Sequence, residues 1–511
     1  MRTIITKLLM LTAVLSASTN IYAYDFEVDG IYYDLTDASN SYCEVVAGDK
    51  KYTGTVKIPS SLIFNGRMLF VMSIDRYAFW YCDGLISITI PNSVKTIPSF
   101  FDCTNLKELI IENGGESLGM SSDTFDNCPL ETVHLGRNLA YSGKSPFYDM
   151  KTLTRLTIGN GVNNIADDTF NGCTGLKELI FDYTNPEITL FLGNNNDISG
   201  CFSDCPLETL YLDRRIDFER PPFSGDSSPI EVTIGNHITE IRDNTFYNCN
   251  QLLHLTIGNK VERIGISAFE GCGRLYEFTI PSRVATIDES AFNGCQNIES
   301  VKIPNSVTLI GSSAFGECYS LKSITIPNSI TSINDRTFYR CKSLESVTIP
   351  NSVTSIGEFA FNGCASLKSI IIPERITSIG EYAFSGCTGL TEINSLNTVP
   401  PTISTTTFDS KNYLYATLNV PINSLRAYQI ADGWGDFWNI CGGLNSVEDD
   451  AINVTSKNGS IIVSGTDSAV AEVYNLSGQL VYSGTDTVIN APSKGIYIVR
   501  VSGQIYKIAV L

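Results

Sequence analysis

The side chains that most often perform acid–base or metal chemistry are few in this chain. It has three histidines, His134, His237 and His254, and lacks a His-Glu-x-x-His, Gly-x-Ser-x-Gly or phosphate-cradling glycine motif. Its 54 aspartates and glutamates are scattered along the sequence. A glycosidase needs two carboxyl groups about 5 to 10 Å apart, and no pair stands out. We therefore expect a protein without enzymatic activity, metal or other cofactor, with a carbohydrate-active enzyme as a remote alternative.

The fifteen cysteines follow a repeated pattern. Twelve of them lie three residues after a phenylalanine, and between residues 246 and 387 this pair recurs every 23 residues. The regular pairs are Phe246/Cys249, Phe269/Cys272, Phe292/Cys295, Phe315/Cys318, Phe338/Cys341, Phe361/Cys364 and Phe384/Cys387. Weaker copies from Phe79 onwards and a last one at Phe408 bring the array to fifteen turns. We expect the twelve cysteines to be reduced core residues, whereas Cys43, Cys201 and Cys441 lie outside the pattern.

A fixed period of this length is typical of a solenoid, because each unit must stack on its neighbours to bury its apolar face. In the unit that begins at Leu321, Ile324 and Ile326 alternate with polar residues and should point inward from a short strand. Phe338 should enter the core from a short helical or 3-10 turn. The predicted fold is a repeat solenoid with short parallel strands, and at about 4.8 Å per turn it should be roughly 70 Å long.

The polar residues between the inward positions should point outward and stack into two rows, which begin at Ser87 and Thr89. Candidate binding residues in the first row are Glu108, Arg155, Glu178, His254, Glu277, Ser323 and Ser346, and those in the second row are Lys302, Thr325 and Thr348. Rows of hydroxyl groups can hydrogen-bond glycans or extended protein segments through many weak contacts. The alternative is that Ser and Thr only reflect repeat homogenisation and strand propensity.

The histidines are expected to be separate surface residues. His254 falls in the first row and His134 in the second, five turns apart, which corresponds to roughly 24 Å. His237 lies at a corner of its repeat. This separation excludes a shared substrate or metal for His134 and His254.

An irregular segment is a second candidate binding region. Cys173 and Cys205 are 32 residues apart instead of 23, and the extra residues fall within 183–200. Shortly afterwards, Arg214, Arg215 and Arg220 concentrate positive charge on an otherwise acidic chain. Loops on a rigid scaffold often carry recognition, although a degenerate repeat would explain the insertion equally simply.

The repeat consensus resembles the BspA-like leucine-rich repeat family over residues 57–441. The resemblance implies a right-handed leucine-rich repeat coil and an exported adhesin-like protein that binds a host matrix protein or a mucosal glycan. A structural protein that self-associates at the cell surface is the alternative function.

The ends of the chain predict further units. Residues 1–23 have the basic start and apolar stretch of a signal peptide, so we expect an exported protein that is secreted or attached to the cell surface or outer membrane. Residues 494–499, Lys-Gly-Ile-Tyr-Ile-Val, and residues 473–481 are similar to the C-terminal sorting domains of the type IX secretion system. The expected units are a signal peptide (1–23), a β cap (24–56), the solenoid (57–420), a helical cap (421–441), a linker (442–450) and a β-sandwich (451–511).

The net charge and hydropathy of the chain limit its partners. The formal charge of −19 argues against nucleic acid, which rewards clustered Lys and Arg. After the signal peptide, no run approaches the roughly 18 apolar residues of a transmembrane helix.

Overall fold

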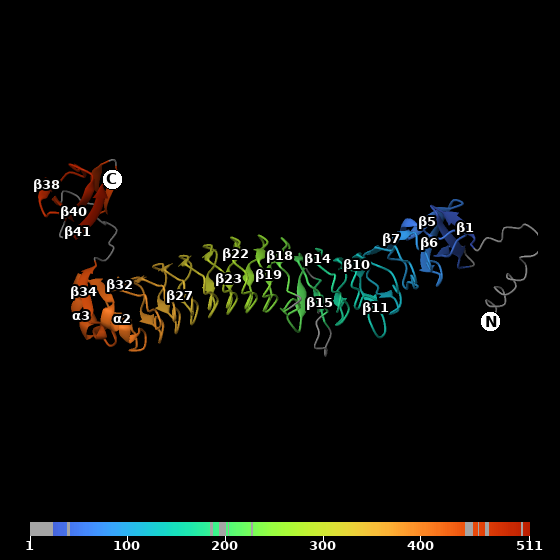
Figure 1. The fold of residues 1–511 in the computed structure, drawn as a ribbon, viewed down its shortest axis with the longest axis horizontal. Helices are drawn as coiled ribbons and strands as arrows, with labels where there is room; N and C mark the ends of the chain where they lie inside the picture. Colours follow the sequence, from blue (N-terminus) through green and yellow to red (C-terminus); the bar gives the residue numbers. More distant parts are fainter. Residues whose placement is uncertain are drawn as a thin grey trace, which may run out of the picture.

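The computed structural model describes residues 24–37, 41–183, 188–193, 201–202, 204–225, 228–444, 453–457, 459–464, 470–501 and 504–510. Its main part is an elongated solenoid of about fifteen coils with a small mixed sheet at its N-terminal end (Figure 1). The predicted signal peptide and most of the predicted linker lie outside the described residues.

The N-terminal sheet begins with a β-hairpin. β1 (Phe26–Val28) and β2 (Ile31–Leu35) are antiparallel, and Asp29 and Gly30 between them have φ of 53° and 77°, the left-handed values of a tight hairpin turn. The sheet is completed by β3 (Tyr42–Val45), β5 (Ser61–Phe64) and β6 (Arg67–Ile74), in the order β1-β2-β3-β6-β5.

One side of the solenoid takes one parallel strand from each coil, and within each of the three sheets on this side the strands are paired in sequence order. Ten strands form the first sheet: β4 (Gly54–Lys57), β7 (Leu85–Ile90), β8 (Glu108–Ile111), β10 (Thr132–Arg137), β12 (Arg155–Gly161), β14 (Glu178–Phe181), β16 (Thr209–Leu212), β18 (Glu231–Ile234), β20 (His254–Thr256) and β22 (Glu277–Phe278). Later coils add two further sheets on the same side: β24 (Ser300–Lys302), β26 (Ser323–Thr325) and β28 (Ser346–Thr348) form one, and β30 (Ser369–Ile372), β32 (Glu392–Ser395), β33 (Thr417–Pro421) and β34 (Asn439–Leu444) form the other.

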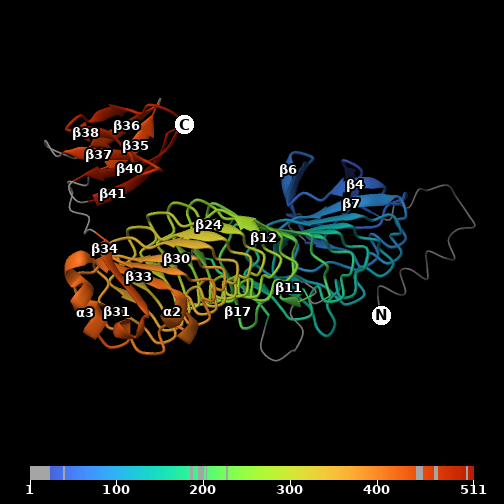
Figure 2. The same ribbon diagram turned by 60° about the vertical axis from the view of Figure 1, so that its left-hand side comes forward.

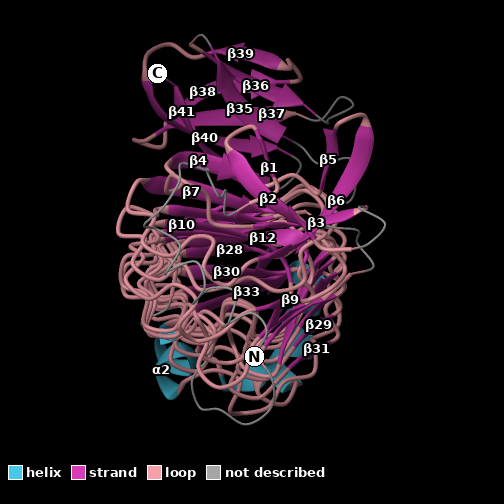
Figure 3. Ribbon diagram, turned by 90° about the vertical axis from the view of Figure 1, so that its right-hand side faces the viewer, coloured by secondary structure: helices cyan, strands magenta, loops and turns pink. Residues whose placement is uncertain are grey.

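Shorter parallel strands line a second side of the solenoid (Figure 3). They are β9 (Leu118–Gly119), β11 (Leu139–Ala140), β13 (Asn164–Ile165), β15 (Leu190–Leu192), β17 (Ile216–Phe218), β19 (Glu240–Ile241), β21 (Arg263–Ile264), β23 (Thr286–Ile287), β25 (Leu309–Ile310), β27 (Ser332–Ile333), β29 (Ser355–Ile356) and β31 (Ser378–Ile379). Turns and loops form the rest of each coil.

The repeated phenylalanines form one continuous column through the core. From Phe79 to Phe408, the ring centroids of consecutive phenylalanines are 5.1 to 6.3 Å apart, and every pair is stacked. Burial of each ring stabilises the fold by about 1.5 to 3 kcal/mol, and the offset stacking adds to this.

The repeated cysteines have a polar role beside their packing role. From Cys103 to Cys387, each ladder thiol donates a hydrogen bond to the carbonyl oxygen of the phenylalanine one coil earlier, over 2.9 to 3.4 Å. Cys318, for example, donates to Phe292. Most of these carbonyl oxygens, that of Phe292 among them, also accept a hydrogen bond from the backbone N–H of the cysteine three residues later, so the thiol is a second donor that links adjacent coils.

This arrangement predicts how the thiols react. Of the fifteen cysteines, all within the described residues, Cys441 alone is exposed, and burial raises the pKa of Cys341 to about 12. Because the thiolate is the reactive form, a maleimide at neutral pH should label one thiol per native chain and all fifteen in guanidinium chloride, as counted by mass spectrometry. A second fast-labelled native thiol, or fewer than fifteen after denaturation, would contradict this prediction.

The turn that carries each phenylalanine is a set of single i→i+3 turns, so the predicted helical or 3-10 segment does not extend beyond one turn. The cause is the residue before each cysteine position, which has φ of 54° to 78° in all fourteen coils from Tyr81 to Gly386. A left-handed residue cannot continue a right-handed helix. Eleven of the fourteen are Gly, Asn or Asp, and the exceptions are Tyr81, Glu317 and Arg340.

The C-terminal end of the solenoid is closed by short helices. α2 (Ser410–Tyr415) follows Phe408, and η2 (Ile422–Ser424), α3 (Leu425–Ile430) and η3 (Trp434–Asp436) follow β33. Trp434 is fully buried with its ring centroid 5.8 Å from that of Phe408, so it covers the end of the phenylalanine column.

A separate small unit follows (Figure 2). One sheet contains β35 (Asn453–Lys457), β36 (Ser460–Ser464) and β39 (Val488–Asn490), and the other contains β38 (Leu480–Gly484), β37 (Ala471–Asn475), β40 (Gly495–Val501) and β41 (Gln504–Val510). Both sheets contribute to one hydrophobic cluster, distinct from that of the solenoid.

Candidate binding face

The register of the ten-stranded sheet sets the outward side chains side by side. The first outward row contains Glu108, Thr132, Arg155, Glu178, Thr209, Glu231, His254 and Glu277, each paired with the next along the sheet. The second outward row contains Ile110, His134, Thr157, Ile180, Tyr211, Thr233 and Thr256. We call the surface formed by both rows the binding face.

The first coil does not belong to this face. Ser87 and Thr89, expected to point outward to solvent, are both buried. Ser87 donates its hydroxyl to Glu108 Oε2 over 2.7 Å. After β7, Ser93 donates to the carbonyl oxygen of Val71 in β6, so the N-terminal sheet packs against this coil and reduces its exposure.

Two hollows lie on the binding face. One, of about 450 Å³, is lined by His254, Thr256, Glu277, Thr279 and neighbouring residues. The other, of about 360 Å³, is lined by Glu178, Ile180, Thr209, Tyr211, Glu231 and Thr233 with the buried leucines between them. Three predicted candidates, Glu178, His254 and Glu277, thus line a hollow. Sequence reasoning missed Thr209 and Glu231, because they lie in coils where the Phe-x-x-Cys spacing is disturbed.

The electrostatic character of the face changes along its length. Arg155 pairs with Glu178 on the next strand, with 3.5 Å between Nη1 and Oε2. Among the described residues, no ion pair includes Glu231 or Glu277, which flank His254 in the first row. The middle of the face is therefore acidic and suited to a cationic partner.

The later coils present hydroxyl groups. Ser300, Ser323 and Ser346 are in register in the first row, and all three are exposed. Lys302, Thr325 and Thr348 are likewise exposed and in register in the second row. The structure thus brings these predicted candidates together, on three coils that begin directly after the coil of Glu277.

The three histidines occupy separate places. His254 is exposed on β20, whereas His134 is half-buried on β10, five strands away, and burial lowers the pKa of His134. His237 Nδ1 lies 2.8 Å from Oδ2 of the buried Asp213, which also accepts a hydrogen bond from Tyr211 Oη over 3.1 Å. Asp213 also accepts from the His237 backbone N–H, so it positions the imidazole and is not a free base.

The prediction that Arg214 belongs to an exposed arginine cluster is wrong, because Arg214 is buried. Its side chain is only 2% exposed, and its Nη1 and Nη2 donate to the carbonyl oxygens of Gly159 and Val162 over 3.0 and 2.6 Å. Burial lowers its pKa to about 10. Arg214 therefore ties its own coil to the coil two strands earlier and cannot meet a partner, whereas Arg215 and Arg220 are exposed. Residues 184–187 and 194–200 of the insertion lie outside the described residues.

Arg137 makes the same type of contact earlier in the solenoid. It is fully buried and donates to the carbonyl oxygens of Pro91 and Asn92 over 2.9 and 3.1 Å. In both cases, a guanidinium group satisfies two carbonyl groups of a distant coil. We call Arg137 and Arg214 the clamp arginines.

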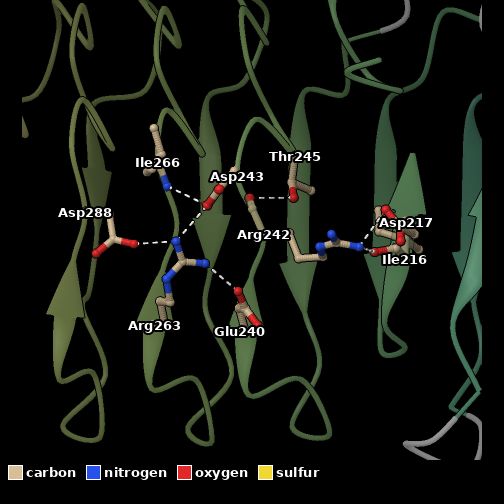
Figure 4. Close-up of polar contacts among 9 residues, drawn as sticks. All are labelled: Ile216, Asp217, Glu240, Arg242, Asp243, Thr245, Arg263, Ile266 and Asp288. Carbon is tan, nitrogen blue, oxygen red and sulfur yellow. Dashed lines mark hydrogen bonds and ion pairs between the residues drawn. The ribbon is translucent and has the colours of Figure 1, made fainter. Parts of the chain in front are cut away.

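The side of the solenoid around β19 and β21 is occupied by internal ion pairs (Figure 4). Arg263 contacts Glu240, Asp243 at 2.8 Å and Asp288 at 2.5 Å, and Arg242 contacts Asp217 at 2.6 Å. These pairs join adjacent coils and neutralise both arginines. This side is accordingly a weaker candidate for binding a charged partner than the binding face.

Fold and binding face together define a repeat solenoid with an extended polar surface. Over residues 72–195, 196–322 and 308–432, the sequence matches the BspA type Leucine rich repeat region, and the chain belongs to this family. No curated protein matches the chain.

Several solved structures are similar to the chain. A leucine-rich repeat protein from Bacteroides ovatus is 24% identical, with a TM-score of 0.42, covering 82% of this chain and 100% of that one. A leucine rich cell surface protein from Faecalibacterium prausnitzii is 23% identical, with a TM-score of 0.28, covering 74% and 96% of the two chains. The pneumococcal vaccine antigen PcpA is 16% identical, with a TM-score of 0.29, covering 84% and 100%. Within the described parts of this chain, no helix has the length and apolar character to cross a membrane.

Proposed function

We propose that this protein is an exported, non-enzymatic surface protein that binds a host protein or glycan along its binding face. The observation that carries the proposal is the in-register array of exposed polar side chains, hollowed at two places, on a scaffold held by the phenylalanine column. The surface location of the Faecalibacterium protein, stated in its description, supports a similar location here.

The chemistry of the acidic part favours a protein segment that carries lysine or arginine. Glu231 and Glu277 flank His254, and the hollow at His254 and Glu277 is open to such a side chain. Many weak contacts along the outward rows together increase the affinity, provided that the partner is extended enough to reach several coils. The hydroxyl-rich coils around Ser323 and Thr325 supply further hydrogen bonds.

Charge reversal of the acidic hollow tests this function. In the variant Glu231→Lys/Glu277→Lys, binding to immobilised extracellular matrix proteins or mucin should weaken by at least about tenfold, because repulsion replaces attraction. The measurement is surface plasmon resonance on the purified protein.

A matched control carries the same charge change on another side of the same part of the solenoid. Glu262 and Glu289 are exposed and lie beside β21 and β23, outside both outward rows. The variant Glu262→Lys/Glu289→Lys should bind like the unmodified protein. Equal binding by both variants would remove the acidic hollow from the proposal.

Self-association is the second candidate function, favoured by the N-terminal sheet. β5 forms one edge of this sheet and carries neither a charged residue nor proline. Ile63 in β5 is 68% exposed, and Met68 and Phe70 in the neighbouring β6 are also exposed. An uncovered apolar edge strand is a surface on which another chain can pair. Concentration-dependent assembly of the purified protein, with no bound host ligand, would favour this alternative.

We further propose that the C-terminal unit serves sorting or surface attachment, as its likeness to type IX secretion sorting domains implies. Its separate hydrophobic cluster supports an independent unit. A role as a plain stabilising domain is the alternative.

A further inference from the structure

An aromatic cluster lies on the turns of the first two coils, away from both outward rows. It consists of Tyr77, Trp80, Tyr81 and Phe101. The rings stand edge to face: Tyr77 and Trp80 have centroids 4.7 Å apart at 88°, and Tyr81 and Phe101 have centroids 5.6 Å apart at 85°. Trp80 also lies 5.9 Å from Phe101, and Tyr81 is 49% exposed. We call these four residues the aromatic cluster.

The cluster departs from the pattern of the other repeats. The two residues before the cysteine are Asn-Gly in three other coils, at Asn171-Gly172, Asn293-Gly294 and Asn362-Gly363. In the first coil they are Trp80 and Tyr81. Tyr81 has φ of 57°, a conformation that a bulky side chain rarely adopts and that glycine adopts freely. Among the fourteen equivalent positions, Tyr81 is the single aromatic residue.

Trp80 adds a second unfavourable feature. Its Nε1 is buried and has no hydrogen-bond partner. Core packing does not require either residue, because the adjacent Phe79 already occupies the phenylalanine column of this coil. An exposed tyrosine in a strained conformation beside a half-buried tryptophan with an unsatisfied Nε1 indicates a function other than stability.

We propose that the aromatic cluster is a binding site for a neutral glycan, whose pyranose rings stack on the exposed aromatic faces. Because the rings stand edge to face, they present separate ring faces and no single flat apolar surface. Separate ring faces suit the C–H groups of individual sugar rings better than they suit a flat apolar surface of another protein. Polar groups surround the rings: Arg76 lies 5.6 Å from the Tyr77 ring centroid, and Lys51 Nζ donates to the carbonyl oxygen of Trp80 over 2.6 Å.

Further polar groups and the net charge narrow the ligand class. Asp102, next to Phe101, accepts a hydrogen bond from Asn127 Nδ2 over 2.7 Å through Oδ1, and carboxylates of this kind accept hydrogen bonds from sugar hydroxyls. The net charge of −19 disfavours sulfated or sialylated glycans. The site is separate from the binding face, so its failure would leave the proposed function intact.

The test replaces Trp80 and Tyr81 by the residues that other coils have at these two positions. The variant Trp80→Asn/Tyr81→Gly carries the Asn-Gly pair found in three other coils and should fold at least as well as the unmodified protein. Affinity electrophoresis in native gels that contain mannan, dextran or galactan measures binding, and gels with heparin serve as the anionic arm. We expect at least one neutral polysaccharide to retard the protein, and the variant to lose at least about tenfold in apparent affinity.

The equivalent pair in another coil supplies the matched control. Tyr339 and Arg340 occupy the same two repeat positions, and Arg340 also has positive φ. The variant Tyr339→Asn/Arg340→Gly should keep the retardation of the unmodified protein. Tyr81→Gly alone, which relieves the strain at this position and removes one ring of the cluster, is the second test variant and should also weaken binding.

Three results would overturn the proposal. The first is absence of retardation in every neutral gel, or retardation by heparin alone. The second is equal retardation of Trp80→Asn/Tyr81→Gly and the unmodified protein at equal thermal stability. The third is a loss of self-association in this variant without any change in sugar binding, which would assign the aromatic cluster to a contact between copies of the chain.

Discussion

Substitution of Phe292 by alanine is expected to lower the free energy of unfolding by about 3 to 5 kcal/mol. Phe292 is fully buried and stacks on Phe269 at 5.3 Å, on Phe315 at 5.5 Å and on Phe278 at 4.7 Å. Removing the ring leaves a cavity in the middle of the phenylalanine column, and coils that are stacked on both sides cannot collapse into it. The measurement is chemical denaturation followed by circular dichroism.

The shape of the unfolding curve gives additional information. In a solenoid, each coil contacts only its neighbours, so a defect in the middle can separate the two halves into distinct transitions. The control is Tyr276→Ala in the same region, since Tyr276 is exposed and its loss should change stability by no more than about 0.5 kcal/mol. An effect of Phe292→Ala no larger than that of the control would show that the phenylalanine column does not hold the coils together.

The second large effect is expected from the clamp arginines. Arg214→Met should destabilise the protein by about 2 to 4 kcal/mol, because the buried carbonyl oxygens of Gly159 and Val162 both lose their guanidinium donors. Methionine keeps much of the side-chain volume, so the change reports on the hydrogen bonds more than on packing. Thermal unfolding followed by circular dichroism measures the change.

The adjacent arginine is a natural comparison for this substitution. Arg215 is exposed, and Arg215→Met should leave the stability within about 0.5 kcal/mol of the unmodified protein. If the two variants unfold at the same temperature, removal of the buried positive charge compensates for the lost hydrogen bonds. The contact of Arg214 with Gly159 and Val162 then contributes no net stability.

Features with a strict period were predictable from sequence. The strand register follows from the 23-residue spacing, and it places Ser323 beside Ser346 and Thr325 beside Thr348 as the repeat alignment predicts. The separation of His134 from His254 by five strands follows from the same alignment. In each case, the position of a residue within its repeat determines its neighbours.

Features that depend on contacts between distant coils were not predictable in this way. Arginine is usually found at the protein surface. Arg214 is buried because it donates to carbonyl groups two strands away, and no local sequence pattern indicates this contact. Ser87 lies in a regular outward position but belongs to the coil against which the N-terminal sheet packs. The pairing of Asp213 with His237 joins two coils whose spacing departs from the period.

The thiol-to-carbonyl hydrogen bond that links each coil to the previous one has a consequence for how the gene can change. Because the donor and acceptor recur with the same spacing from Cys249 to Cys387, any two points one period apart in this region have equivalent neighbours. Unequal recombination between such points adds or removes one whole coil and joins a cysteine to the phenylalanine that it would have met anyway. The regular half of the solenoid can therefore become longer or shorter by whole coils during evolution, while its cross-section stays the same.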